Sequence, residues 1–212
     1  MQVSDTQVSA GPVNGASVEP FEPELEDFAQ QIADAVESFL VTLQAMSREE
    51  DPGSVVPLLL VEISQILFAG ARLGAQRDFE PTLEYQPDVG PDPDLDAMRL
   101  RLARLLDSVD TYTYNFDPYD PLITQGLLSD DLTGIATDLA NGLRHFRAGD
   151  VMEALWWWQY SYVATWGNFA SAALRALQSV VAHDRLDTDY ASVDEAEQIA
   201  VAEALDAGQT TL

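Results

Sequence analysis

The chain has 212 residues, a formal charge of −26 from 36 acidic and 10 basic side chains, and 47% hydrophobic residues. This apolar content supplies a folded core and excludes wholesale disorder, whereas the negative charge opposes direct binding to nucleic acid or to an anionic membrane surface. The absence of cysteine excludes disulfides, thiolate catalysis and thiolate metal sites.

The first predicted element is an N-terminal tail. Residues 1–20 are rich in Gly, Pro, Ser and acids without sustained periodicity, which predicts disorder. Residues 21–190 form the predicted helical domain. Its first helix begins near Pro23 and shows apolar residues at three- and four-residue steps as far as Met46. An Asp-Pro-Gly run at 51–53 ends this helix.

The second predicted helix, from about Ser54 to Leu73, is apolar on most of its faces and is therefore expected in the interior. Polar residues such as Glu62 interrupt it, whereas a membrane span needs about 20 mostly apolar residues, so we interpret it as a buried helix of a soluble protein. Gly70 would permit the close approach of another backbone. Residues 75–94 hold four prolines among six acids, which predicts an extended, solvated loop.

A third helix is predicted over 94–109 and a fourth over 129–149, because both segments show apolar residues at helical spacing. Residues 110–128 between them have no clear period but are rich in aromatic side chains. Asp117 and Asp120 are each followed by proline, which is typical of turns. We expect this segment to be an aromatic loop that packs against the body. No segment of the chain shows a convincing strand alternation.

The fifth predicted helix is the longest and holds three consecutive tryptophans. Asp150 with Glu153 resembles a capping box at its start, and helical spacing then persists to about His183. Trp158 belongs to a continuous apolar stripe, which indicates that this helix is central. Gly167 is the one position where a bend is expected.

Together these elements predict an all-α fold, a single-domain bundle of five to six helices around a long central Trp-rich helix. The C-terminal segment, residues 191–212, is expected to form a short acidic helix and a tail. The N-terminus lacks the positive start and apolar run of a signal peptide, so we expect a cytoplasmic protein. The chain has no lysine and 22 aspartates, which indicates either a GC-rich coding bias or salt adaptation, and the normal apolar content favours the coding bias.

The sequence shows no recognised catalytic motif. It lacks the Gly-x-Ser-x-Gly elbow, the Walker-type loop and Gly-x-Gly-x-x-Gly. The two histidines, His145 and His183, have no carboxylate or histidine three or four residues before them, so the Glu-x-x-His motif of di-iron bundles is missing. We predict no metal site, no cofactor and no catalytic residue, while an enzymatic activity stays open.

Five residues are candidate contacts for a ligand or a partner protein. Glu62, within the apolar second helix, either forms a structural ion pair with an arginine or serves as a ligand contact with a raised pKa. Trp157 lies on a second, more polar face of the Trp-rich helix, where it either packs or recognises a partner through its indole N–H. The candidates are Glu62, Gln65, Arg72, Trp157 and Tyr160.

Three runs of residues resemble an actinobacterial domain-of-unknown-function family. They are Pro-Leu-Leu-Leu-Val-Glu-Ile-Ser-Gln at 57–65, Glu-Ala-Leu-Trp-Trp-Trp-Gln at 153–159 and Ala-Ser-Ala-Ala-Leu-Arg-Ala-Leu-Gln-Ser at 170–179. The resemblance spans about residues 24–186, and the Trp-triplet helix is its specific part. It implies a small cytoplasmic helical protein from a GC-rich genome, and it brings no activity, cofactor or site.

Three functions follow from these observations. The favoured one is action through protein–protein contacts, including self-association as a homodimer, because helices that are apolar nearly all round need neighbours. The second is a small-molecule binder or enzyme with a pocket between the second and fifth helices, where bundles often hold ligands. The third is an acidic mimic of nucleic acid that occupies a basic partner.

Overall fold

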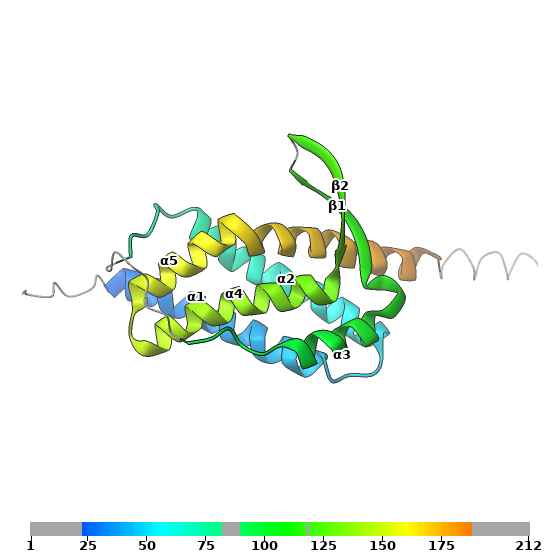
Figure 1. The fold of residues 1–212 in the computed structure, drawn as a ribbon, viewed down its shortest axis with the longest axis horizontal. Helices are drawn as coiled ribbons and strands as arrows, with labels where there is room; N and C mark the ends of the chain where they lie inside the picture. The colour runs from blue at the N-terminus through cyan, green and yellow to red at the C-terminus, as the bar shows by residue number, and fades with distance from the viewer. Residues whose placement is uncertain (1–22, 82–89, 118, 188–212) are drawn as a thin grey trace, which may run out of the picture.

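A bundle of α-helices with one projecting β-hairpin makes up the computed structural model, which describes residues 23–81, 90–117 and 119–187 (Figure 1). The predicted mostly helical bundle is confirmed. The elements in chain order are α1 (Pro23–Met46), α2 (Pro52–Gly74), α3 (Asp96–Leu106), the 3₁₀ turn η1 (Asp107–Val109), β1 (Thr111–Asp117), β2 (Asp120–Leu127), α4 (Leu128–Ala148), α5 (Val151–Ser161) and the π-helical turn η2 (Tyr162–Trp166), after which residues 167–187 are α-helical.

Local chemistry explains where the long helices begin and end. The Asp51 carboxylate caps α2, because its Oδ1 accepts from the Gly53 N–H at 3.0 Å and its Oδ2 from the Ser54 N–H at 3.2 Å. At the other end of the bundle, Gly149 ends α4 with a φ of 89°, a left-handed conformation that glycine adopts without strain. The chain then reverses directly into α5.

The tryptophan-rich helix contributes one face to the core, where it packs against α4, α2 and α1. The side chains of Trp158 and Trp166 are fully buried, and the Trp158 Nε1 donates to the Leu139 carbonyl of α4 at 3.0 Å. Trp156 and Trp157 are only half-buried, because consecutive residues point about 100° apart around a helix. The stripe of core side chains therefore follows one face of the helix.

Glycines on the facing helices let these aromatic rings approach closely. A Cβ at Gly142 of α4 would overlap the Trp158 indole, and a Cβ at Gly70 of α2 would come within 2.5 Å of the Tyr162 and Trp166 rings. The predicted approach of another backbone at Gly70 is wrong, because aromatic side chains fill the space there.

The fifth predicted helix is interrupted by a π turn. At η2 the Gly167 N–H donates to the Tyr162 carbonyl, five residues earlier, in place of the usual four. A Cβ at Gly167 would overlap that carbonyl oxygen, so the turn requires glycine at this position. The irregularity lies where a bend was expected, and helical structure continues to residue 187.

The prediction of an aromatic loop over 110–128 without strands is wrong. β1 and β2 pair antiparallel with Thr113 opposite Gln125 and a bulge between Asn115 and Asp117, and the hairpin projects from the bundle (Figure 1). Most of its side chains are exposed, and β2 lacks the apolar alternation that marks a half-buried strand. The predicted turn at Asp117 is confirmed, since its Oδ1 accepts from the Tyr119 N–H at 2.8 Å.

Two further predictions need correction. The Asp150 side chain makes no capping hydrogen bond at the start of α5, so the capping box is absent. The described ends of the 75–94 loop are not simply solvated: the Phe79 N–H donates to Gln159 Oε1 at 2.8 Å, and Asn141 Nδ2 donates to Asp92 Oδ1 at 3.0 Å. These contacts dock the loop because the buried amides of α4 and α5 need partners. The predicted tails 1–20 and 191–212 lie outside the described residues.

Candidate functional site

The five sequence-selected residues do not form one site. Glu62 is half-exposed on α2, and burial raises the pKa of its carboxyl group. Arg72 donates to Gln31 Oε1 of α1 at 2.7 Å and lies 5.1 Å from the Phe28 ring centroid. It lines, with Gln65, an apolar groove of about 610 Å³ on the outer side of α1 and α2.

The other two residues lie on α5. Trp157 Nε1 donates to the Asp138 carbonyl of α4 at 2.9 Å, and Tyr160 stacks on Trp156 with the ring centroids 5.3 Å apart. Glu62, Gln65 and Arg72 do not lie beside these aromatic residues. The five residues therefore do not form the expected pocket between the second and fifth helices. Packing at Gly70 brings α2 against the rings of η2 instead.

By length and composition alone, α2 is the single helix in the described part of the chain that could cross a membrane. One side of α2 is buried in the core, including Leu59, Ile63 and Ile66. Its other side exposes Leu58, Val61 and Phe68. Core packing explains why the buried side of α2 is apolar. The exposed side is an apolar face that the described residues do not cover.

The hairpin, which the sequence did not predict, is held at its base by a polar cluster at the start of α4. Asp110 precedes β1, and its carboxylate accepts from both the N–H and the Oγ of Ser129, at 2.7 and 2.9 Å. The Leu128 N–H donates to the Asp110 carbonyl at 2.8 Å. Asp110 thereby caps the first turn of α4 from a different segment, and the positive end of the helix dipole favours its charge.

Two tyrosines of β1 complete the base of the hairpin. The Tyr112 hydroxyl donates a short hydrogen bond to Asp131 Oδ2 of α4, and Tyr114 stacks on Tyr112 with the centroids 5.4 Å apart. Gly126 of β2 faces both rings, and a Cβ there would lie 3.1 Å from each. The base is therefore ordered by contacts with α4.

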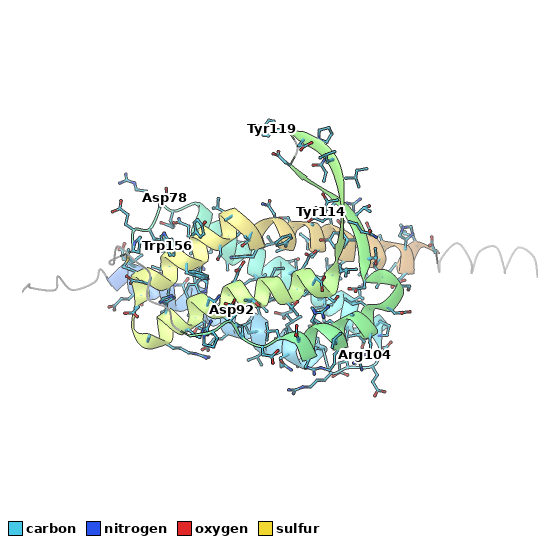
Figure 2. The ribbon with its side chains drawn as sticks, viewed as in Figure 1. Asp78, Asp92, Arg104, Tyr114, Tyr119 and Trp156 are labelled. Carbon is cyan, nitrogen blue, oxygen red and sulfur yellow. The ribbon has the colours of Figure 1, made fainter. Side chains whose placement is uncertain are left out.

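The tip of the hairpin is exposed. Tyr119 is 95% exposed, and Leu122 and Ile123 of β2 are 68% and 78% exposed. Figure 2 shows Tyr119 at the far end of the hairpin, away from the bundle, with Tyr114 nearer the helices. The hairpin thus combines an anchored base with an uncovered apolar tip.

Comparison with known proteins places the chain in a family. A family model described as a domain of unknown function, DUF5063, matches residues 23–183. The chain belongs to the DUF5063 family. The expected resemblance to a domain-of-unknown-function family is therefore confirmed, while its actinobacterial origin stays a prediction. None of the curated proteins matches the sequence.

Comparison with solved structures finds a similar fold for this DUF5063 chain. The similar structure is protein BF1032 from Bacteroides fragilis, a target of the Northeast Structural Genomics Consortium, with a TM-score of 0.60 and 18% identity. The similarity covers 73% of this chain and 92% of that chain. At this identity the likeness concerns the fold alone, so function must be argued from the side chains of this protein.

The histidines of this DUF5063 chain do not form a metal centre with other residues that the structure describes. His145 is buried near the end of α4 beside Trp157, and burial lowers the pKa of its imidazole. His183 is exposed and lies 3.3 Å from Asp187, which follows it by one helical turn.

The polar cluster at the base of the hairpin predicts a dependence of stability on pH. Burial raises the pKa of the Asp131 carboxyl, and the charges of Asp130 and Asp110 raise it further, although the Tyr112 hydrogen bond lowers it. The folded protein therefore holds this proton more tightly than the unfolded chain. Protonated Asp131 therefore stabilises the fold at a pH below about 4, the pKa of an aspartate in the unfolded chain. This stabilisation is lost as the pH rises through the higher pKa that Asp131 has in the folded protein.

The free energy of unfolding of the wild type should fall between pH 4.5 and pH 7. We expect a smaller fall for Asp131→Asn, because its amide oxygen still accepts from Tyr112 but carries no charge at either pH. Urea unfolding at both pH values measures this difference. Asp120→Asn, at the exposed start of β2, controls for the removal of one negative charge. Equal pH slopes for the wild type and Asp131→Asn would contradict the prediction.

Proposed function

We propose that this DUF5063 protein acts through protein–protein contacts made by the tip of the β1–β2 hairpin. The observation that carries the proposal is the exposure of Tyr119, Leu122 and Ile123 on a projecting arm. A two-stranded hairpin alone is at best marginally stable in water, and exposed apolar side chains gather at interaction surfaces. A partner that covers the tip removes this apolar area from water.

The charges at the tip favour a partner other than a second copy. Asp117 and Asp120 flank the turn and form no ion pair with the described residues. A second copy has no lysine and a charge of −26, so it supplies few cations to meet these carboxylates. The partner that fits is a different protein with an apolar contact surface bordered by Lys and Arg.

Self-association is the second candidate, and the outer face of α2 favours it. This face exposes Leu58, Val61 and Phe68, and Glu62 is the single charged residue between positions 52 and 71. Two highly negative copies repel each other least where the contacting surfaces carry little charge. A dimer in solution would therefore use α2 rather than the hairpin.

We expect the double substitution Leu122→Ser and Ile123→Ser to weaken partner binding at least tenfold while leaving the unfolding free energy within about 0.5 kcal/mol of the wild type, because both side chains are already exposed. The measurement is quantitative co-purification from an extract of the native cells, followed by titration of the purified partner at low and high salt.

Phe68→Ser is the matched control, because Phe68 and Leu122 are both 68% exposed. It should leave binding of the partner at the hairpin tip unchanged. Sedimentation velocity of the same three proteins measures self-association, which Phe68→Ser should reduce if α2 forms a dimer. The tip proposal would be overturned if the Leu122→Ser, Ile123→Ser variant still bound the partner and Phe68→Ser did not.

A further inference from the structure

A groove of about 790 Å³ lies at the base of the hairpin, between β1 and the helix of residues 167–187. Figure 1 shows the hairpin crossing this helix before it projects from the bundle. One wall is formed by residues 111–115 of β1, and the other by residues of the helix between Asn168 and Val180. Although the chain is strongly acidic, no acidic residue lines the groove, and Arg175 is its one charged side chain among the described residues.

The β1 wall presents an open strand edge. The hydrogen bond from the Leu128 N–H to the Asp110 carbonyl marks these two residues as a hydrogen-bonded pair. Such pairs alternate along an antiparallel ladder, so Tyr112 and Tyr114 direct their backbone groups toward β2. The backbone N–H and C=O groups that point away from β2 belong to Thr111, Thr113 and Asn115.

No other strand covers this edge, because the described sheet has two strands and β2 lies on the opposite side of β1. Unpaired backbone groups on a strand edge are a template for pairing with another extended chain. The edge borders the groove along the five residues from Thr111 to Asn115. Five residues of an extended chain span about 17 Å.

The helix wall leaves room for a chain and provides one positive charge. Small side chains at three- and four-residue spacing share the face toward the hairpin, namely Ser171, Ala172, Ala176 and Ser179. Arg175 on the same wall is exposed and contacts Gln178 Oε1 at 3.4 Å. In the part of the chain that the structure describes, no carboxylate forms an ion pair with it.

We infer that this groove binds an extended peptide segment of a partner protein, which adds as a third strand to the edge of β1 and places an acidic side chain against Arg175. Main-chain hydrogen bonds to Thr111, Thr113 and Asn115 hold the segment, as in other strand-addition complexes. A carboxylate on Arg175 makes a charge-assisted hydrogen bond and sets the register. The inference goes beyond the proposed function, since it uses a different surface from the tip.

A second copy of the chain fits this groove less well. Pairing of two β1 edges would place residues 111–115 of one copy, Thr-Tyr-Thr-Tyr-Asn, beside Arg175 of the other. That segment holds no carboxylate, so the Arg175 charge would gain no counter-ion. A segment from a different protein can supply one.

Seven-residue peptides with alternating valine and threonine and one glutamate, placed in turn at each position, are suitable probes with the full-length protein. Matched peptides carry glutamine in place of glutamate. We expect the best glutamate peptide to slow amide hydrogen exchange at Thr111, Thr113 and Asn115, measured by NMR. The amides of Tyr112 and Tyr114 should change little, because they already bond to β2. Absence of this alternating protection at millimolar peptide would overturn the inference.

Two variants test the two walls separately. Arg175→Gln should weaken the glutamate peptide roughly tenfold and leave the glutamine peptide unchanged, because the lost interaction is with the carboxylate. Thr113→Pro should abolish binding of both peptides, since proline removes an outward N–H and is tolerated at a strand edge that faces away from its partner. Equal affinity of wild type and Arg175→Gln for the glutamate peptide would contradict the assigned contact.

The tip variant separates this inference from the proposed function. Leu122→Ser with Ile123→Ser should bind the peptide as tightly as the wild type, because neither residue lines the groove. If the peptide binds but the tip substitutions do not affect partner capture, the groove stands and the tip proposal fails. Concentration-dependent protection of Thr111, Thr113 and Asn115 without any peptide would instead show that a second copy fills the groove and would overturn the inference.

Discussion

Replacing Trp158 by alanine is expected to lower the free energy of unfolding by about 3–5 kcal/mol, the range found for removal of a large buried aromatic side chain. Trp158 is fully buried, its ring centroid lies 6.1 Å from that of Phe146, and its Nε1 donates to the Leu139 carbonyl. The substitution leaves a cavity between α4 and α5 that the backbone of α4 cannot fill. Urea unfolding followed by circular dichroism measures the loss.

Trp156→Ala is the matched control, because it removes the same side chain two positions away in the same helix. Trp156 is half-buried and stacks on the exposed Tyr160, so its truncation is expected to cost about 1 kcal/mol. Similar losses for the two variants would show that Trp158 does not lie at the centre of the core.

The second large effect is expected at Gly142, where alanine should destabilise the protein by about 1–3 kcal/mol. The added methyl group would overlap the Trp158 indole, which is fixed by its hydrogen bond to Leu139 and cannot withdraw. The effect is notable because alanine is normally the better helix former by about 1 kcal/mol. Steric overlap must therefore outweigh an intrinsic gain.

Gly134→Ala in the same helix should have the opposite sign. No atom lies within 4 Å of a Cβ at Gly134, so the substitution is expected to stabilise the protein by about 0.5–1 kcal/mol through the helix propensity of alanine. Thermal and urea unfolding of both variants measure the pair. Stabilisation by Gly142→Ala would contradict the close contact between α4 and the Trp158 ring.

The helices could be predicted from the sequence because burial on one face imposes a periodic pattern. Spacing alone placed Trp158 in the apolar stripe, and its side chain is fully buried. The π turn at η2 could not be predicted in the same way, because apolar spacing does not mark a change to a five-residue hydrogen bond. Gly70 of α2 leaves space for the Tyr162 and Trp166 rings, and that contact joins residues far apart in the chain.

The candidate site was the part that sequence reasoning missed. The run Thr-Tyr-Thr-Tyr at 111–114 does alternate, and β-branched and aromatic residues favour strands. Asp-Pro pairs on both sides of the turn obscured this signal, and the exposed β2 strand lacks an apolar face that would mark it. Two runs of β-branched and aromatic residues around an Asp-Pro-Tyr-Asp turn would have been the usable indication of a hairpin.

The five candidate contacts failed to converge for a different reason. Glu62, Gln65 and Arg72 lie on a helix that is apolar on several faces, and periodicity does not determine which face meets which neighbour. The structure turns Gln65 and Arg72 toward α1 and the outer surface, while Trp157 turns toward α4. Assignment of faces depends on how whole helices pack, which no local pattern contains.

The π turn at η2 sets the rotational phase of everything that follows it. An α-helix advances about 100° per residue, so the additional residue in the turn rotates the downstream stretch by that angle relative to an uninterrupted helix. Ser171 and Arg175 look toward β1 only in this phase. A regular α-helix through η2 with no residue deleted would turn them aside and move Ala173, now interior, out of the core. The π turn thus accommodates one additional residue and keeps the downstream surface facing the hairpin.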